Sequence, residues 1–471
     1  MTKSNEEKVY LFEQMPIPKA VIRLGIPTVI GCLVMILYNL ADTYFVGQLN
    51  DPIENAAVTL AAPVILSFNA VTNLFGTGCS SMVSRALGVR DYDTVKKTAA
   101  FGFYCTIVAG LLYSACCGLF ENQLLKILGA AGESLSTTSK YLFWTVTIGA
   151  VPSMLNVVMS NLVRAEGSAL HASIGVMSGC LLNIVLDPFF ILDFGLGMGA
   201  SGAGLATMIS NCVACVYFFV YLAVKRGNTY VSIKLSDFKP NRNIVKNVCY
   251  VGIPASIQNL LNVTGMTVLN NMMSVYSNEA VAAIGIAHKT TMIPMYISMG
   301  LGQGVLPLIG YNFSAKNGKR MKQAILYTTK VSSGFMFGAT VLFYIFSSQI
   351  SAAFIDNPLT VEYGTAFMRG LILAQPFLAL DFLAVGVFQA CGMGGRSFIF
   401  AVMRKVVLEI PALLVLDRLF PMYGLAYAQL VAEVILAAVA FIALRQILRR
   451  ADGWTDVTGA SSEPVTVEEG E

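Results

Sequence analysis

Long stretches of this sequence carry almost no charge, and this feature restricts the chain to very few kinds of fold. Apolar, nearly uncharged runs begin near residues 18, 54, 98, 138, 168, 200, 245, 280, 324, 362, 396 and 422. A bilayer with a hydrocarbon core of about 30 Å is crossed by a helix of ~20 apolar residues. The runs are too long, and alternate too little, for the strands of a membrane barrel. We therefore expect an all-α polytopic membrane protein with twelve transmembrane helices.

The few charged residues are unevenly distributed. They make up 12% of the chain, against about 25% in soluble domains, and the mean hydropathy is +0.67. Basic residues gather before the first run and in alternate loops: Lys19, Arg23, Arg85, Arg90, Lys96, Lys97, Lys225, Arg226, Lys234, Lys239, Arg242, Lys246, Lys316, Lys319, Arg320, Lys322, Arg445, Arg449 and Arg450. The other loops carry mainly acidic residues: Asp51, Glu54, Glu121, Glu133, Glu279, Asp356 and Glu362. Because basic loops stay cytoplasmic, we expect a multi-pass plasma-membrane protein with both termini in the cytoplasm and no cleaved signal peptide.

The chain contains the same plan twice. "LGIPTVIGCL", from Leu24, resembles "VGIPASIQNL", from Val251, and "GTGCSSMVSRALGVRDYDTVKK", from Gly76, aligns with "GQGVLPLIGYNFSAKNGKRMKQ", from Gly302. Each copy holds six runs, an even number, so both copies enter the membrane in the same orientation. Such repeats are related by an axis along the membrane normal. The sequence therefore predicts two six-helix bundles related by pseudo-two-fold symmetry along that normal.

The domain boundaries follow from this duplication. We expect a cytoplasmic N-terminal segment at 1–17, an N-lobe at 18–224, a cytoplasmic linker at 225–244, a C-lobe at 245–447 and a polar, acidic tail at 448–471. Two facing bundles that rock against each other make an alternating-access carrier. A channel would require a repeated filter motif around one pore, and the sequence contains none. A monomer suffices for the carrier.

Two carboxylates lie inside apolar runs of the N-lobe. Asp42 and Asp187 each follow a polar residue by one helical turn, Tyr38 and Asn183 respectively. Pro188 frees a carbonyl one turn earlier, next to the second carboxylate. A charge at the bilayer centre costs ~3 kcal/mol or more, so such residues usually mark a pathway. Together these oxygens suit Na⁺ or a transferable proton.

Less specific interpretations remain open for both carboxylates. Asp42 would also fit the end of a helix near the outer interface, and Asp187 would fit a helix end that faces water beside Pro188. The second copy lacks the pair, since Asn270 and Asn271 stand where Asp42 stands in the first copy. A coupling-ion site, if present, is therefore expected in the N-lobe.

The C-lobe has its own polar residues inside apolar runs. Asp381 is the best candidate for a second site facing the central cavity, whereas Lys405 and Glu409 are one turn apart and suited to pair with each other. Arg404 is expected to extend toward the cytoplasmic face, Glu433 to neutralise a cationic neighbour, and His288 and Lys289 have no assigned role. Methionines would form an adaptable apolar wall, although ordinary packing explains them as well. We expect the substrate cavity to include Asp381, Met154, Met295 and Asn270.

The sequence gives little support for an enzyme. It has two histidines, no Asp-x-x-Asp and no nucleophile beside a base, and its ten cysteines lie mostly within apolar runs as small hydrophobic residues. We therefore expect no enzymatic activity, no cofactor and no metal beyond Na⁺ at Asp42 and Asp187. The expected partners are the bilayer and small organic cations or drugs, not nucleic acid.

Five segments, in order and with the duplication, resemble the multidrug and toxic compound extrusion (MATE) family. They are "GIPTVIGCLVMILYNLADTYFVGQL", "SRALGVRDYD", "RAEGSALHA", "NIVLDPFFI" and "GASGAGLAT". The resemblance extends from about residue 12 to 447. It implies an antiporter in which Na⁺ or H⁺ enters while an amphipathic, often cationic, organic compound leaves. A flippase for a lipid-linked oligosaccharide is the alternative; it would need several Arg or Lys in the cavity, and the predicted interior is poor in them.

The resemblance also implies which residues bind the coupling ion. In the DinF-like branch a cluster in the N-lobe does so, and the matching positions are Tyr38, Asp42, Asn183, Asp187 and, in "GAGLAT", Thr207. Another branch uses an acidic residue on the seventh helix with an aspartate on the tenth. Here the seventh helix offers Asn270 and Asn271, so the resemblance favours the DinF-like branch.

Overall fold

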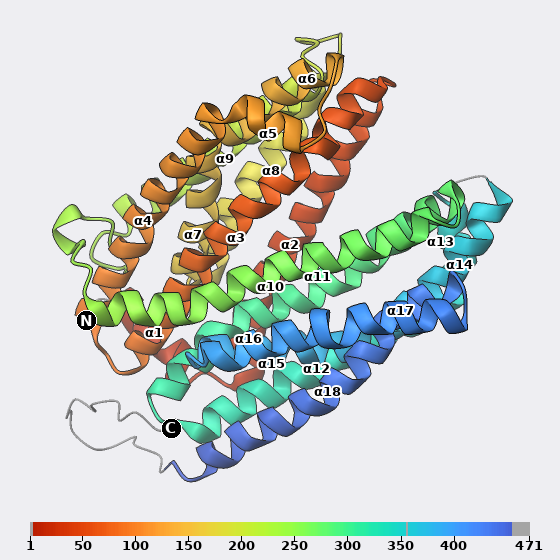
Figure 1. The fold of residues 1–471 in the computed structure, drawn as a ribbon. Helices are drawn as coiled ribbons and strands as arrows, with labels where there is room; N and C mark the ends of the chain where they lie inside the picture. The colour runs from red at the N-terminus through yellow and green to blue at the C-terminus, as the bar shows by residue number, and fades with distance from the viewer. Residues whose placement is uncertain (1–2, 355–356, 455–471) are drawn as a thin grey trace.

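The computed structural model describes residues 3–354 and 357–454, which are helical with no strand. The helices form two bundles that meet at one end and diverge toward the other (Figure 1). The N-lobe contains α2 (Ile17–Gly47), α3 (Pro52–Gly88), α4 (Tyr92–Leu119), α5 (Glu121–Ile127), α6 (Glu133–Leu142), η1 (Phe143–Ile148), α7 (Ala150–Ala165), α8 (Ala169–Ile191) and α9 (Ala200–Val224). The C-lobe contains α10 (Arg242–Ser274), α11 (Asn278–Ser314), α12 (Gly318–Ile345), α13 (Ser347–Ala352), α14 (Pro358–Leu373), α15 (Gln375–Ala390), α16 (Gly394–Val402), η3 (Met403–Glu409), α17 (Ile410–Leu419) and α18 (Tyr423–Asp452). Helix α1 (Lys3–Glu13) precedes both bundles, and the short η2 (Leu235–Asp237) lies between them in the chain.

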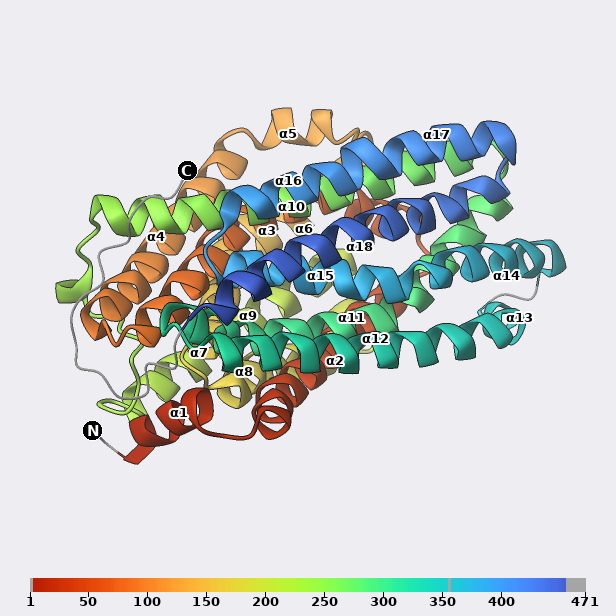
Figure 2. The same cartoon turned by 90° about the horizontal axis from the view of Figure 1, so that it is seen from below.

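Twelve spans are assembled from these helices, as the sequence predicted. Within the described residues, seven single helices are long and apolar enough to cross a membrane, and two bent pairs, α6–η1 with α7 and α14 with α15, pass the same test as units. The continuous run α16–η3–α17 and the long helices α10 and α12 complete the C-lobe, whose helices run nearly parallel in Figure 2. The Asp356 loop position and residues 455–471 of the expected tail lie outside the described residues.

The bent spans show the duplication in three dimensions. The fourth span bends by 48° before α7 and the tenth by 43° before α15. Pro152 and Pro376, at equivalent positions of the two copies, lie in the first turn of these second segments. Proline is tolerated there because the first residues of a helix have no partner for their N–H groups. The same residue type therefore allows the same break in both lobes.

Helix caps repeat in the same way. Asp91 accepts a hydrogen bond from the backbone N–H of Thr94 at 3.0 Å, and Asn317, its counterpart in the second copy, accepts one from Arg320 N–H at 3.1 Å. Such caps satisfy backbone donors that a helix start leaves free. The preceding residues, Arg90 and Lys316, both adopt a positive φ, of 60° and 57° respectively. The two loops thus share one turn despite their different sequences.

Paired glycines hold the bundles together where they converge. A Cβ on Gly78 of α3 would clash with the Val248 carbonyl of α10, and one on Gly252 of α10 would clash with the Leu74 carbonyl of α3. The equivalent contact between α2 and α11 uses Gly25 and Gly304, and a Cβ on Gly304 would lie 2.5 Å from the Leu24 carbonyl. Small residues let membrane helices approach closely. The joint between the lobes is therefore itself pseudo-symmetric.

Helix α1 contacts both lobes. Lys8 forms an ion pair of 3.0 Å with the fully buried Glu166 at the end of α7, in the N-lobe. Arg320 of α12, in the C-lobe, donates to the carbonyls of Phe12 at 2.5 Å and Met15 at 2.7 Å. The N-terminal segment is thus a helix that contacts both lobes, a feature that its polar sequence did not predict.

Candidate functional site

The carboxylate cluster of the N-lobe lies where α2, α8 and α9 meet. Tyr38 Oη of α2 is 3.4 Å from Thr207 Oγ1 of α9. The Asn183 amide fits its surroundings best with its nitrogen toward Asp187, donating to Oδ2 at 2.9 Å, while its oxygen accepts from the Thr207 N–H at 3.1 Å. The structure therefore brings the four polar residues Tyr38, Asn183, Asp187 and Thr207 into one connected group.

Asp42 belongs to the same cluster. It lies close enough to Asp187 and Tyr38 for direct charge interaction, and Tyr141 of α6 is within the same range. Its Oδ1 is buried and accepts no hydrogen bond from a described residue. Across residues 3–354 and 357–454, neither Asp42 nor Asp187 forms an ion pair with a basic side chain. Two neighbouring carboxylates thus lack a built-in counter-charge.

The positions of these aspartates decide between the interpretations left open by the sequence. Helix α2 continues past Asp42 to Gly47, and α8 continues past Asp187 and Pro188 to Ile191. Asp187 is fully buried, whereas Asp42 is partly exposed. Neither residue caps a helix or faces water at a helix end. The observed arrangement is an interior, oxygen-rich cluster.

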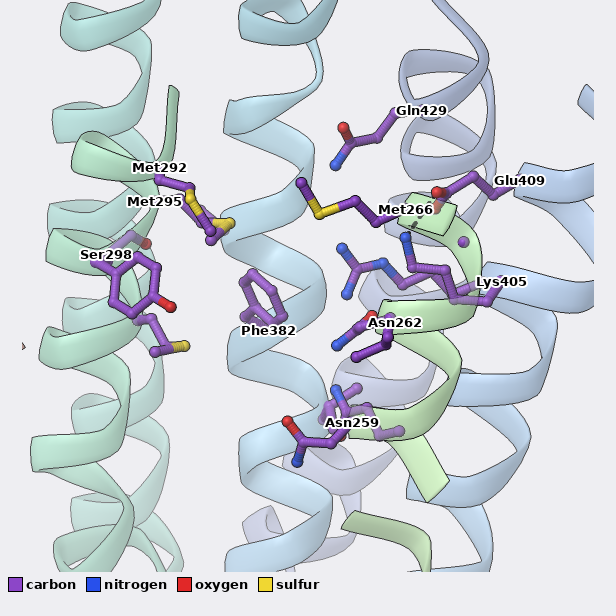
Figure 3. A pocket seen from close by; sticks show the side chains of 18 of the residues that line it. Asn259, Asn262, Met266, Met292, Met295, Ser298, Phe382, Lys405, Glu409 and Gln429 are labelled. Atoms are coloured by element: carbon purple, nitrogen blue, oxygen red, sulfur yellow. Dashed lines mark hydrogen bonds and ion pairs between the residues drawn. The ribbon is translucent and has the colours of Figure 1, made fainter. Parts of the chain in front are cut away.

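A cavity of about 710 Å³ opens mainly within the C-lobe. One wall comes from α11, with Tyr296, Met292, Met295 and Met299, and the centre holds Phe382 of α15 (Figure 3). The facing wall comes from α10, η3 and α18, with further polar residues that include Gln258, Asn259, Asn262, Asn270 and Gln429. Three N-lobe residues, Leu66, Asn73 and Thr77 of α3, also line it. The cavity combines an apolar wall with a polar one, as ligand sites generally do.

The polar wall carries a buried network of ion pairs. Lys405 Nζ is 2.6 Å from Glu409 Oε1, and Arg404 Nε is 2.7 Å from Glu433 Oε1. Arg404 Nη1 is also 3.6 Å from Asp381 Oδ2. The predicted Lys405–Glu409 pair and the neutralising role of Glu433 are confirmed. The expectation that Arg404 extends to the cytoplasmic face is wrong, because this side chain is buried between two carboxylates.

Only some of the residues expected to line the cavity do so. Met295 and Asn270 line the cavity, as expected, but Met154 and Asp381 do not. Met154 is fully buried in the N-lobe, where it packs near Gly110, so ordinary packing is its role. Asp381 is fully buried behind Arg404. The interior was also expected to be poor in basic residues, yet Arg404 and Lys405 line the cavity, which corrects that expectation.

Sequence reasoning missed several lining residues. Gln258, Asn259 and Asn262 form a polar stripe on one face of α10 at helical spacing, a pattern that was visible in an otherwise apolar run. His288, left without a role, lines the cavity, and its Nε2 has no hydrogen-bond partner within the described chain. Residues 3–354 and 357–454 contain no group of three or more His, Cys, Asp or Glu placed to hold a metal ion.

Comparisons with known proteins match the chain over most of its length. The MatE family model matches residues 27–189 and 254–415, one match in each lobe. The multidrug export protein MepA of Staphylococcus aureus is 34% identical over 439 residues, covering 93% of this chain and 95% of the relative. The MepA of Staphylococcus haemolyticus is 33% identical over 448 residues, covering 94% and 97%. A multidrug resistance MATE transporter solved in an outward-facing conformation superposes with a TM-score of 0.89 at 27% identity, covering 96% of this chain and 99% of that structure.

Proposed function

Because the chain belongs to the multidrug and toxic compound extrusion (MATE) family, we propose that it exports amphipathic, often cationic, organic compounds in exchange for Na⁺ or H⁺. The protein is proposed to act as a monomer in the plasma membrane, with both termini in the cytoplasm. The basic loops at the end where the lobes converge support this orientation. The coupling ion enters through the N-lobe cluster, and the exported compound occupies the cavity of the C-lobe.

The observation that carries this proposal is the pair of interior carboxylates that have no cationic partner among the described residues. Two like charges in a medium of low dielectric constant repel, and a bound Na⁺ or proton relieves that repulsion. Tyr38 and Thr207 add hydroxyl oxygens beside them, and Asn183 donates an N–H to Asp187. The cluster therefore supports binding of one small monovalent cation. The same residues support assignment to the DinF-like branch, which stays a prediction.

Exchange requires that ion and drug bind with opposing preference. By linkage, a cation that lowers drug affinity must itself be bound less tightly when the drug is present. Asp42 lies on α2, which packs against α11 through Gly25 and Gly300, and α11 carries the methionine wall of the cavity. We propose that cation binding shifts α2 and α8, and that this movement reaches the cavity through the contact between α2 and α11.

Reconstituted protein provides the test. Drug efflux from proteoliposomes is measured under separately imposed Na⁺ and pH gradients for wild type, Asp42→Asn and Asp187→Asn. We expect each substitution to abolish gradient-driven efflux while expression and folding persist. The exposed Asp193 in the loop after α8 supplies the matched control Asp193→Asn, which should leave efflux unchanged. Unchanged ion-driven efflux in both interior variants would refute the proposal.

A flippase for lipid-linked oligosaccharides is the second candidate, favoured by Arg404 and Lys405 at the cavity. A pyrophosphate needs cations that are not already neutralised, and here each faces a carboxylate within 2.7 Å. The network therefore supports the drug exporter over the flippase. Transbilayer movement of a fluorescent lipid pyrophosphate, matched against efflux of a cationic dye in the same vesicles, separates the two.

A further inference from the structure

We propose that Glu409 is the specificity-determining residue of the C-lobe cavity, and that it selects monocationic aromatic compounds whose positive nitrogen carries an N–H. This inference rests on the proposed function, because it assigns the recognition chemistry of the exporter's cavity. The protonated amine of the compound donates to Glu409 Oε2, and its aromatic part lies against the opposite wall.

The first support is an oxygen without a donor. Lys405 Nζ donates a hydrogen bond to Glu409 Oε1 at 2.6 Å. Oε2 of the same carboxylate is buried and has no hydrogen-bond partner among the described residues. A buried acceptor without a donor is costly, and nearly all such atoms in proteins are paired. Since Glu409 lines the cavity, a ligand entering it is well placed to supply the missing donor.

The second support is the local helix geometry. All three charged residues of the cavity wall, Arg404, Lys405 and Glu409, belong to η3, a π-helical stretch between α16 and α17. π-Helical turns are uncommon and frequently occur at functional sites. Opposite the pair, α10 has Gly265, where an added Cβ would lie 3.0 Å from Lys405 Cδ and 3.2 Å from Glu409 Oε1. The missing side chain at Gly265 of α10 thus leaves space for the Lys405 and Glu409 side chains.

The third support is the charge of the network. Three carboxylates, Asp381, Glu409 and Glu433, face two cations, Arg404 and Lys405. With every group ionised, the network is one positive charge short. His288 of α11 also lies close enough to interact with Lys405 and Glu409. A single cationic group on the ligand balances the network, whereas a dication over-compensates it and an anion increases the imbalance.

The shape of the cavity fits an amphipathic ligand in one orientation. Figure 3 shows Lys405 and Glu409 on one side and Met292 and Met295 on the opposite side, with Phe382 between them. Methionine adapts to varied apolar shapes and makes favourable contacts with aromatic rings, and Phe382 can stack against a flat ring. A ligand therefore points its amine toward η3 and its rings toward α11.

Three acridine probes with the same ring and linker test this assignment. One ends in a dimethylamino group, protonated and bearing an N–H; one in a trimethylammonium group, charged without an N–H; and one in a neutral isopropyl group. Binding to purified wild-type protein in detergent is measured by fluorescence without any ion gradient. We expect the dimethylamino probe to bind about tenfold more tightly than the trimethylammonium probe, since a hydrogen bond to a charged group is lost.

Variants of the cavity wall then test whether Glu409 is the source of the preference for the dimethylamino probe. Glu409→Gln should reduce the difference between the dimethylamino and trimethylammonium probes to less than twofold. This change leaves Lys405 buried without its partner, which can destabilise the fold. The double variant Lys405→Met with Glu409→Gln removes both charges and therefore tests the same prediction without an unpaired buried charge. Gly265→Ala, which is compatible with a helix, should weaken the preference partially by crowding the pair.

The outcomes separate this inference from the proposed function. Asp187→Asn removes part of the N-lobe cluster and should keep the full amine preference. Equal binding of the two charged probes to wild type, or an undiminished preference in both Glu409 variants, would overturn the inference. Neither result touches cation-driven efflux, which depends on Asp42 and Asp187 and is measured separately.

Discussion

The two lobes share one backbone plan but treat buried charge in opposite ways. In the N-lobe, Asp42 and Asp187 lie together without a basic partner in the described chain. In the C-lobe, Asp381, Glu409 and Glu433 face Arg404 and Lys405. A buried charge must be neutralised in some way. Under the proposed function the N-lobe takes its counter-charge from solution, whereas the C-lobe carries most of its counter-charge within the described chain.

A duplicated fold thus holds two different polar interiors. The glycine joint, the bent spans and the capped loops repeat in both copies. The polar residues do not, since Asn270 stands in the stretch equivalent to that of Asp42. The repeated features determine how the helices pack, and the proposed function assigns the different binding tasks of the two lobes to the unrepeated ones.

The largest expected effect comes from removing a built-in cation. Arg404→Met leaves Glu433 and Asp381 buried without their partner, which should destabilise the protein by about 3–5 kcal/mol. By contrast, Asp187→Asn removes one of two like charges and should leave the melting temperature in cation-free buffer unchanged or higher. Thermal unfolding in detergent measures both, with Arg418→Met at an exposed position as the control. Equal destabilisation by the two changes would show that the lobes do not differ as described.

The second prediction compares the two glycine contacts between the lobes, one at Gly78 and one at Gly304. Gly78→Val and Gly304→Val each place a side chain against a carbonyl of the opposite lobe, and each should cost about 1–3 kcal/mol from overpacking. Gly338→Val in α12, where nothing lies within 4 Å of an added Cβ, is the control. Unfolding temperatures of the three variants give the comparison, and a marked effect at only one joint position would contradict the shared plan.

A third prediction concerns stabilisation by the coupling ion. A cation that binds the folded N-lobe adds about 2.7 kcal/mol to stability at a concentration 100 times its Kd. Wild type should therefore melt at a higher temperature in Na⁺, or at lower pH if the ion is a proton. Asp42→Asn should lose this response and Glu409→Gln should keep it. A response that vanishes only in the Glu409 variant would move the ion site to the C-lobe.

The smallest expected effect is at the neutral oxygens. Tyr38→Phe removes a hydroxyl that contacts Thr207 at 3.4 Å, and its loss should weaken apparent cation affinity about fivefold. Tyr44, exposed on the same helix, gives the matched control Tyr44→Phe. The concentration of cation giving half-maximal efflux is the measurement, and no change in the Tyr38 variant would remove this residue from the site.

The sequence predicted much of the fold because hydropathy and repetition are local signals. The twelve run starts lie within six residues of the helix starts, for example 200 for α9 and 422 for α18. The sequence showed Pro152 and Pro376 as a pair of equivalent prolines. It did not predict the bends of 48° and 43°, because a proline near a helix start is equally compatible with a straight span.

The C-lobe was less predictable because its chemistry depends on contacts distant in sequence. Arg404 and Glu433 are 29 residues apart, and only the packing of η3 against α18 brings them to 2.7 Å. The π-helical stretch has no composition signal, so the direction of Arg404 was mistaken, and Asp381 was placed at the cavity when it lies behind that arginine. In the N-lobe, Asp42 and Asp187 were carboxylates within apolar runs, and each followed a polar residue by one helical turn, which made the pairs recognisable.

The most direct measurement is the release of the coupling cation when an amphipathic amine binds at equilibrium. Purified protein loaded with ²²Na⁺, or held in weak buffer for proton detection, is saturated with the dimethylamino acridine. We predict cation release in wild type and in the double variant of Lys405 and Glu409 at saturating probe, and none in Asp42→Asn or Asp187→Asn. Full release from both aspartate variants would contradict the account, because the exchanged ion would then be held elsewhere.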